Sequence, residues 1–135
     1  MCGIVGAVAQ RDVGPILIEG LRRLEYRGYD SWGIASLTNN KLTIIKEVGA
    51  ISEAPISLLK DPKSTIAISH TRWATTGGVT KTNAHPHWSK NKKIYVVHNG
   101  IIENYQELKK KYKIKPVSET DTEIGFILYF FFNSW

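Results

Sequence analysis

Cysteine is almost absent from this chain of 135 residues, and it has no long apolar run. Its one cysteine, Cys2, excludes an internal disulfide framework and any multi-cysteine metal site. The most apolar stretch, residues 124–132, is about half the ~20 residues that a transmembrane helix needs. The first residues also lack the basic stretch and apolar core of a secretory signal. We therefore expect a cytoplasmic chain in a reducing compartment, with no membrane partner.

Acidic residues are outnumbered, since 12 aspartates and glutamates stand against 18 lysines and arginines, for a net charge of +6. Eight of the lysines fall between residues 90 and 115. A nucleic-acid patch interleaves its lysines with arginines and aromatic residues, so a solvated face is the favoured interpretation. Nucleic acid is not an expected partner, although a basic nucleic-acid-binding module stays an alternative. The 42% of hydrophobic residues and the chain length predict a single globular domain.

Apolar periodicity predicts short elements in the first half of the chain. Residues 3–9 are typical of a buried strand, and a helix is expected to open near Pro15 and to stop by Gly28. Strand-like runs at 33–37 and 42–48 flank Asn39-Asn40. Because both asparagines tolerate positive φ, a two-residue hairpin is predicted there.

The second half of the chain is less periodic. Thr120 and Glu123 form a capping-box pattern, which predicts a helix that runs into the apolar tail. The other expected elements are a helix at 52–62, a strand at 65–69, a long ordered loop at 70–89, a strand at 93–98 and a helix at 103–112. This non-alternating order favours an α+β architecture with antiparallel sheets.

Cys2 is the first candidate for chemistry. If Met1 is removed, one residue carries both a thiol and a free α-amine, whose pKa near 7.7–8.0 lets it accept a proton at neutral pH. A thiol beside a base can form covalent acyl intermediates. Taken alone, however, a single cysteine is more often a small buried hydrophobe.

Five further positions could bind a small zwitterion or stabilise an oxyanion. An Asn99 amide and the Gly100 N–H could donate to a developing oxyanion, although Asn-Gly is also a common turn. Arg27 and Arg72 are candidate carboxylate clamps, with surface salt bridges as the alternative. Asp121 could bind an ammonium group or simply complement a helix N-terminus.

The four histidines at positions 70, 85, 87 and 98 resemble a metal site only at first sight. His85-Pro86-His87 cannot place two ligands one helical turn apart, and no acidic ligand is near in the sequence. We therefore expect no metal and no cofactor.

Six segments in order give the chain a family resemblance. They are MCGIVG at 1–6, LRRLEYRGYDS at 21–31, HTRWAT at 70–75, NAHPH at 83–87, HNGIIEN at 98–104 and SETDTE at 118–123. Together they resemble the N-terminal glutaminase domain of the glucosamine-6-phosphate synthases, also called glutamine–fructose-6-phosphate aminotransferases (isomerizing). The Cys-Gly-Ile start is shared by all class II glutamine amidotransferases, whereas the LRRLEYRGYDS, HTRWAT and SETDTE segments are similar to this family in particular.

The resemblance implies an N-terminal-nucleophile hydrolase fold, in which helical layers enclose two antiparallel sheets. It implies that Cys2 attacks the side-chain amide of L-glutamine and releases glutamate and ammonia. The other implied roles are Asn99 and Gly100 as oxyanion hole, Arg72 for the α-carboxylate, Asp121 for the α-amine, Thr75 as a substrate contact, Trp73 as the covering aromatic that gates ammonia and Arg27 as organiser of the nucleophile end. Fructose-6-phosphate, and a homo-oligomer, would involve isomerase domains outside this chain.

Three departures from the family pattern qualify these expectations. Trp32 stands where the family usually has alanine, so it should displace neighbours or point outward. Thr76 stands where histidine is common in the substrate loop. Residues 124–135 form an apolar aromatic tail that resembles nothing in the family at that place. We accordingly expect a partial glutaminase domain over 1–123, incomplete at its C-terminus. The alternative is an inactive remnant that only binds glutamine or a full-length homologue.

Overall fold

The computed structural model describes residues 1–54, 64–89 and 91–133. Four antiparallel strands form the main sheet, in the order β1-β4-β2-β3. Their bounds are Gly3–Val8 for β1, Ser31–Thr38 for β2, Lys41–Val48 for β3 and Ile66–Arg72 for β4. A two-stranded antiparallel sheet pairs β5, His87–Trp88, with β6, Tyr95–Val96.

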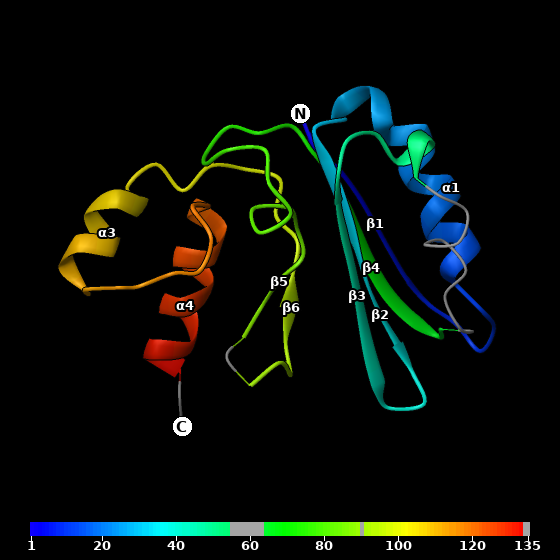
Figure 1. Cartoon of the computed structure of the whole chain (residues 1–135). Helices are drawn as coiled ribbons and strands as arrows, with labels where there is room; N and C mark the ends of the chain where they lie inside the picture. The colour runs from blue at the N-terminus through cyan, green and yellow to red at the C-terminus, as the bar shows by residue number, and fades with distance from the viewer. Residues whose placement is uncertain (55–63, 90, 134–135) are drawn as a thin grey trace.

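Helices lie on both outer sides of the two sheets. Helix α1, Gly14–Leu24, covers one face of the main sheet, and β5–β6 lies against the other. Beyond β5–β6 come α4, Asp121–Asn133, and α3, Tyr105–Lys111 (Figure 1). The predicted α+β fold with antiparallel sheets is therefore confirmed. Among the described residues, no helix combines the length and apolar composition needed to cross a bilayer.

The β2–β3 hairpin forms as the sequence predicts. Asn39 and Asn40 have φ of 49° and 60°, and Thr38 pairs with Lys41 on either side of them. Positive φ at both central residues gives a turn whose twist matches that of the strands. This hairpin fixes the register of β3, and so determines which of its side chains face the second sheet.

The apolar core lies between α1 and the main sheet. Trp32 is 1% exposed, so the side chain points inward rather than outward. It packs in one cluster with residues of α1, β2, β4 and the loops beside them, namely Val13, Leu17, Leu21, Ile34, Ile51 and Ala67. Burial of such side chains contributes roughly 1.5–3 kcal/mol each.

The layer between the two sheets is polar instead. His70 stacks on His85 with ring centroids 4.3 Å apart, and His85 meets the edge of His87 at 4.6 Å. At Gly33 the loop backbone comes so close to β2 that a Cβ would collide with the His85 carbonyl oxygen. Glycine is therefore required at this position for the two layers to approach each other.

Several predicted elements differ from the structure. Among the described residues, β1 pairs only with β4. Its Ile4 and Val8 are exposed on one face, while Val5 and Ala7 on the other face pack partly buried against the core, so the expectation of a buried strand is wrong. Strand β4 continues to Arg72, so the loop expected from residue 70 begins three residues later. Strand β6 covers only two residues of the expected 93–98. The helix expected at 52–62 falls mostly outside the described residues.

Candidate functional site

Cys2 lies beside the start of β1, at the end of the sheet where β4 gives way to the loop that carries Trp73. The Trp73 backbone N–H donates to Cys2 Sγ at 3.4 Å, and the thiol lies 3.8 Å from the Trp73 carbonyl oxygen. The next residue is held too, since the Gly3 N–H donates to Thr71 Oγ1 at 3.1 Å. The main sheet therefore fixes the Cys2 sulfur beside the first residue of the loop that follows β4.

Asn99, in the segment that follows β6, binds Cys2 through its side chain. The Cys2 backbone N–H donates to Asn99 Oδ1 at 3.4 Å, and Asn99 Nδ2 donates to the Cys2 carbonyl oxygen at 3.2 Å. One side-chain amide thus contacts both backbone groups of Cys2, across 97 positions of sequence. An amide nitrogen carries two hydrogens, so the second remains for another acceptor. Gly100 follows directly and lines the same small cavity as Cys2.

Arg72 ends β4 with a guanidinium that is bound by its own loop. The side chain donates to the carbonyl oxygen of Gly78 at 3.0 Å and to that of Thr76. The residue is 3% exposed, and this burial lowers the pKa of the guanidinium, while the charges of Cys2, Asp30 and Asp121 oppose the shift. Among the described residues, no carboxylate lies within ion-pair distance of this guanidinium, so backbone oxygens compensate the buried cation.

Asp121 is the first residue of α4 and is also satisfied from within the chain. Its Oδ1 accepts a hydrogen bond from Thr76 Oγ1 at 2.8 Å, and its Oδ2 accepts one from the Ile102 N–H at 2.7 Å. Thr120 caps the helix, with its Oγ1 accepting from the Glu123 N–H at 3.4 Å. The capping box is only half formed, because the Glu123 carboxylate accepts from two backbone N–H groups before the helix instead.

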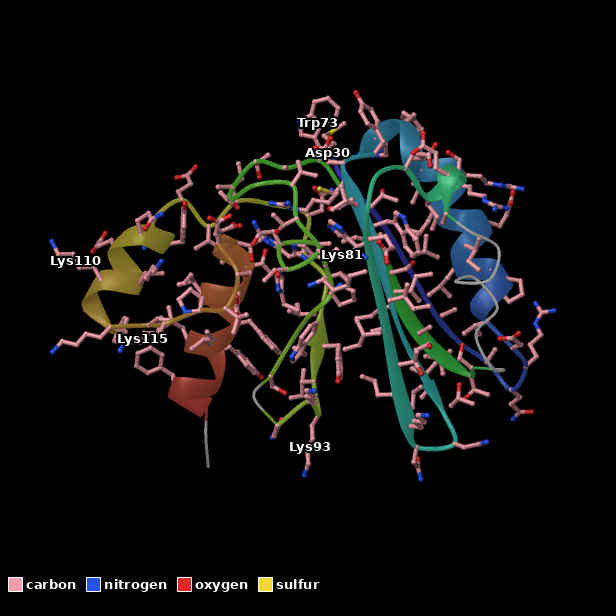
Figure 2. All side chains as sticks on the ribbon, in the orientation of Figure 1. Asp30, Trp73, Lys81, Lys93, Lys110 and Lys115 are labelled. Carbon is pink, nitrogen blue, oxygen red and sulfur yellow. The ribbon has the colours of Figure 1, made fainter. Side chains whose placement is uncertain are left out.

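The remaining expected residues lie around this centre. Trp73 is 43% exposed and meets the edge of Tyr29, with ring centroids 5.4 Å apart. Figure 2 places Trp73 and Asp30 together at the end of the sheet where the chain begins. Thr75 lines the cavity. Arg27 lies outside it and contacts Met1, with Nη2 3.7 Å from the methionine sulfur.

Three residues that sequence reasoning missed hold the loop over the site. Asp30 Oδ2 accepts from the Ala74 N–H at 2.8 Å. Glu119 Oε2 accepts from the Gly78 N–H at 3.0 Å and from Asn83 Nδ2 at 2.7 Å, and both donors lower the pKa of this carboxyl. Asp30, Asn83 and Glu119 all fall within the segments that carry the resemblance, but their chemistry alone gives no signal, because carboxylates and amides at loop ends are ordinary.

Buried histidines between the two sheets position the backbone just before Asn99. The His98 N–H donates to His85 Nδ1 at 3.2 Å, and His70 Nε2 lies 3.1 Å from the His98 carbonyl oxygen. Burial lowers the pKa of His70 to about 4 and that of His87 to about 3, so both rings are neutral at pH 7. His85 and His70 hold the backbone of His98, which leads into Asn99 and Gly100, whereas His87 Nε2 lies 2.9 Å from Thr120 Oγ1.

The cavity enclosed by these residues is small. It measures about 20 Å³ and is lined by Cys2, Arg72, Asp121 and Gly100 among others. A volume near 15 Å³ on this measure holds one water molecule. The structure therefore brings together the thiol, cation, anion and amide that the sequence predicts. In this arrangement, which we call closed, the carbonyl oxygens of Thr76 and Gly78 accept from Arg72, and the Thr76 hydroxyl donates to Asp121.

Comparison with known proteins identifies the class. Residues 1–130 match the family described as "Glutamine amidotransferases class-II". The chain therefore belongs to the class II glutamine amidotransferases. It is 54% identical over 129 residues to a glutamine–fructose-6-phosphate aminotransferase (isomerizing) of Pseudomonas putida, and 50% identical over 129 residues to that of Bacteroides thetaiotaomicron. Each match covers 92% of this chain and 21% of the relative, so the chain spans about a fifth of their length.

Solved structures agree on the fold. A glutamine phosphoribosylpyrophosphate amidotransferase from B. subtilis, complexed with ADP and GMP, superposes with a TM-score of 0.73 at 29% identity, over 89% of this chain and 28% of that one. A structure described as the allosteric regulatory enzyme of purine biosynthesis gives 0.74 at 30% identity, over 91% and 27%. The expected N-terminal-nucleophile fold is thereby confirmed.

Proposed function

We propose that this chain hydrolyses the side-chain amide of L-glutamine to glutamate and ammonia, with Cys2 as nucleophile once Met1 is removed. The observation that carries the proposal is the contact of Cys2 with Asn99 and Trp73, beside Arg72 and Asp121, in a member of the class II glutamine amidotransferases. Glutamine is a zwitterion with a neutral amide. Its binding needs one cation and one anion, and its hydrolysis needs a nucleophile and an oxyanion donor. This cluster contains all four.

In the proposed reaction the Cys2 α-amine takes the thiol proton, and Sγ attacks the amide carbon. The second Asn99 Nδ2 hydrogen and the Gly100 N–H donate to the developing oxyanion. The α-amine then protonates the leaving nitrogen, so ammonia departs and a γ-glutamyl thioester forms. Water attacks the thioester carbonyl, the C–S bond breaks, and the thiol is restored with release of glutamate.

We assign substrate binding to Arg72 and Asp121, which in this structure form hydrogen bonds with the loop at residues 76–78. Arg72 would exchange the Thr76 and Gly78 carbonyl oxygens for the α-carboxylate, and Asp121 would exchange the Thr76 hydroxyl for the α-ammonium group. Thr75 would contact the substrate from the same loop, Trp73 would cover the site and gate ammonia, and Arg27 would organise the nucleophile end. Because a cavity of about 20 Å³ cannot contain glutamine, the loop must open first.

The relatives named above are aminotransferases that act with fructose-6-phosphate, and we propose the same acceptor for the longer protein to which such a domain belongs. Fructose-6-phosphate and a homo-oligomer would then depend on isomerase domains outside this chain. The cytoplasmic location expected from the sequence stays a prediction.

A glutamine analogue with an electrophilic diazoketone in place of the amide tests the function. We expect one covalent adduct on Cys2 in chains that have lost Met1, and glutamate release from glutamine by the same preparation. The Cys2→Ser variant is the matched control and should show neither. A folded chain without Met1 whose thiol stays unmodified would refute the proposal, and glutamine binding without turnover would favour the inactive remnant.

A further inference from the structure

The loop that follows β4 is held at two points, one on each side of residues 75–77. At its start, the Ala74 N–H donates to Asp30 Oδ2 at 2.8 Å. Further on, the Gly78 N–H donates to Glu119 Oε2 at 3.0 Å. Asp30 comes directly before β2, and Glu119 lies two residues before α4. The loop is therefore fixed to the main sheet at one end and to the segment that leads into α4 at the other (Figure 1).

The second of these points holds both backbone groups of Gly78. Asn83 Nδ2 uses its two hydrogens to donate to the Gly78 carbonyl oxygen at 3.0 Å and to Glu119 Oε2 at 2.7 Å. Asn83 Oδ1 accepts from the Glu119 N–H at 2.9 Å. Asn83 is 1% exposed, so its amide is shielded from water. We call this group of Gly78, Asn83 and Glu119 the loop anchor.

Residues 75–77 are held differently. Among the described residues, none accepts a hydrogen bond from their three N–H groups. Their polar contacts come from Thr76 and go to Arg72 and Asp121, the two residues that we assign to the substrate. Gly77 has a φ of 74°, a region in which glycine carries no steric penalty. A substrate that takes over Arg72 and Asp121 would therefore free residues 75–77.

The loop anchor would survive the same exchange. The hydrogen bonds that join Gly78, Asn83 and Glu119 to one another include neither Arg72 nor Asp121. Arg72 can let go of the Gly78 carbonyl oxygen, and Asn83 still holds it. One end of the moving segment thus stays in place whether or not the substrate groups are occupied.

We propose that Glu119 and Asn83 are positioning residues of the glutaminase: they keep Gly78 in place while residues 75–77 open to admit glutamine and close over it. The inference rests on the proposed function. With the anchor intact, only three residues have to be ordered when the loop closes, and less ordering means a smaller entropy cost of binding.

The size of the effect follows from the residues that loss of the anchor would free. Without Glu119, at least Gly78 has to be ordered as well, and fixing the backbone of one residue corresponds to about a tenfold change in an equilibrium constant. Glutamine should accordingly bind roughly tenfold more weakly. Cys2 and Asn99 lie outside the loop, so the rate at which bound glutamine is hydrolysed should change little.

Calorimetric titration of glutamine into Cys2→Ser chains, together with hydrolysis rates of chains that keep Cys2, tests the proposal. Glu119→Ala should raise the dissociation constant and KM roughly tenfold and leave kcat within about twofold, a split that a general loss of folded chain would not produce. Glu119→Gln keeps an oxygen that can accept from both donors, so its dissociation constant should stay within about threefold of the unaltered one.

Glu123→Ala is the matched control. The Glu123 carboxylate also accepts from two N–H groups in the same segment, but these belong to Val117 and Ser118, outside the loop. The variant loses the same charge and the same kind of hydrogen bond, and should bind glutamine as the unaltered chain does. Equal weakening by Glu119→Ala and Glu123→Ala would trace the effect to the segment that carries Asp121, and would overturn the proposal.

Amide hydrogen exchange of the full chain, followed by NMR, is a second measurement that needs no glutamine. The Gly78 amide should exchange at least about tenfold more slowly than those of residues 75–77. Glu119→Ala should remove this protection and leave that of Ala74, which depends on Asp30. Equal exchange at Gly78 and residues 75–77 in the unaltered chain would overturn the proposal, as would unchanged or tighter glutamine binding by folded Glu119→Ala.

Failure of the proposed function has a different outcome. Chains that neither bind glutamine as Cys2→Ser nor form an adduct on Cys2 would refute the glutaminase, and with it any role of Glu119 in binding glutamine. The exchange rates would still decide whether Glu119 fixes the loop at Gly78.

Discussion

Thr76→Val should tighten glutamine binding, because Thr76 competes with the substrate for Asp121. In the closed structure the Thr76 hydroxyl donates to Asp121 Oδ1 at 2.8 Å, at the carboxylate we assign to the α-ammonium group. Valine has nearly the same shape but no hydroxyl. The change therefore removes the competing hydrogen bond and leaves the loop backbone, including the carbonyl oxygens on Arg72, in place.

The magnitude follows from the hydrogen bond. A bond to a buried charged group contributes about 1.5–3 kcal/mol, and Asp121 is 3% exposed. The apparent dissociation constant equals the intrinsic one divided by the open fraction of the protein. Taking the lower figure, loss of the bond raises the ratio of open to closed chains about tenfold, so the dissociation constant should fall by up to roughly tenfold.

Calorimetric titration of glutamine into Cys2→Ser chains measures this directly, with and without Thr76→Val. Thr80→Val is the matched control, because the Thr80 hydroxyl accepts from the Asn83 N–H at 3.2 Å and holds the same loop without touching Asp121. An equal gain from both variants would mean that general loosening of the loop is responsible. Weaker binding by Thr76→Val would show that the hydroxyl contacts the substrate, and would refute the reasoning.

Three further predictions concern stability. Gly33→Ala should lower the unfolding free energy by about 1–3 kcal/mol, because its Cβ collides with the His85 carbonyl oxygen; a thermal midpoint that does not fall would contradict this. Trp32→Ala should cost about 3–5 kcal/mol in urea unfolding and Trp88→Ala distinctly less, because Trp32 is 1% and Trp88 38% exposed; equal losses would disprove the assignment of Trp32 to the core. The contribution of His70 to the unfolding free energy should be fully present above pH 6.5 and should be lost, by about 3 kcal/mol, as the pH falls toward 4. The reason is that the ring takes up a proton near pH 6.5 in the unfolded chain but only near pH 4 when it is buried. Urea midpoints at pH 7 and 4.5 measure this loss, and equal midpoints would count against a neutral buried ring.

The parts of the fold that the sequence predicts are those set by local chemistry. Asn39-Asn40 specifies a hairpin by its tolerance of positive φ, and Pro15 marks a helix start. Strand β4 was underestimated because its last three residues, His70 to Arg72, are polar, and only the neighbouring layers make their burial possible. The inward position of Trp32 likewise depends on space between α1 and the sheet, which no local pattern reveals.

The site divides in the same way. The residue types and the family resemblance predict Cys2, Arg72 and Asp121, and the structure brings them together; their roles stay predictions. The pairing of Thr76 with Asp121 could not be predicted, because it joins positions 45 apart through a loop conformation that no residue type dictates. The clamp of Glu119 on Gly78 is equally invisible, since it depends on where α4 meets the loop.

The double contact between Asn99 and Cys2 makes assembly of the centre an all-or-none event. The thiol comes from the residue before the first strand and the amide from a segment 97 positions later, so a ribosome must release most of this chain before the two can meet. Under the proposed mechanism a nascent or half-melted chain carries an ordinary thiol with no polarising partner. Ammonia is then released only by molecules whose two sheets have already docked, and wasteful breakdown of glutamine by immature chains is avoided.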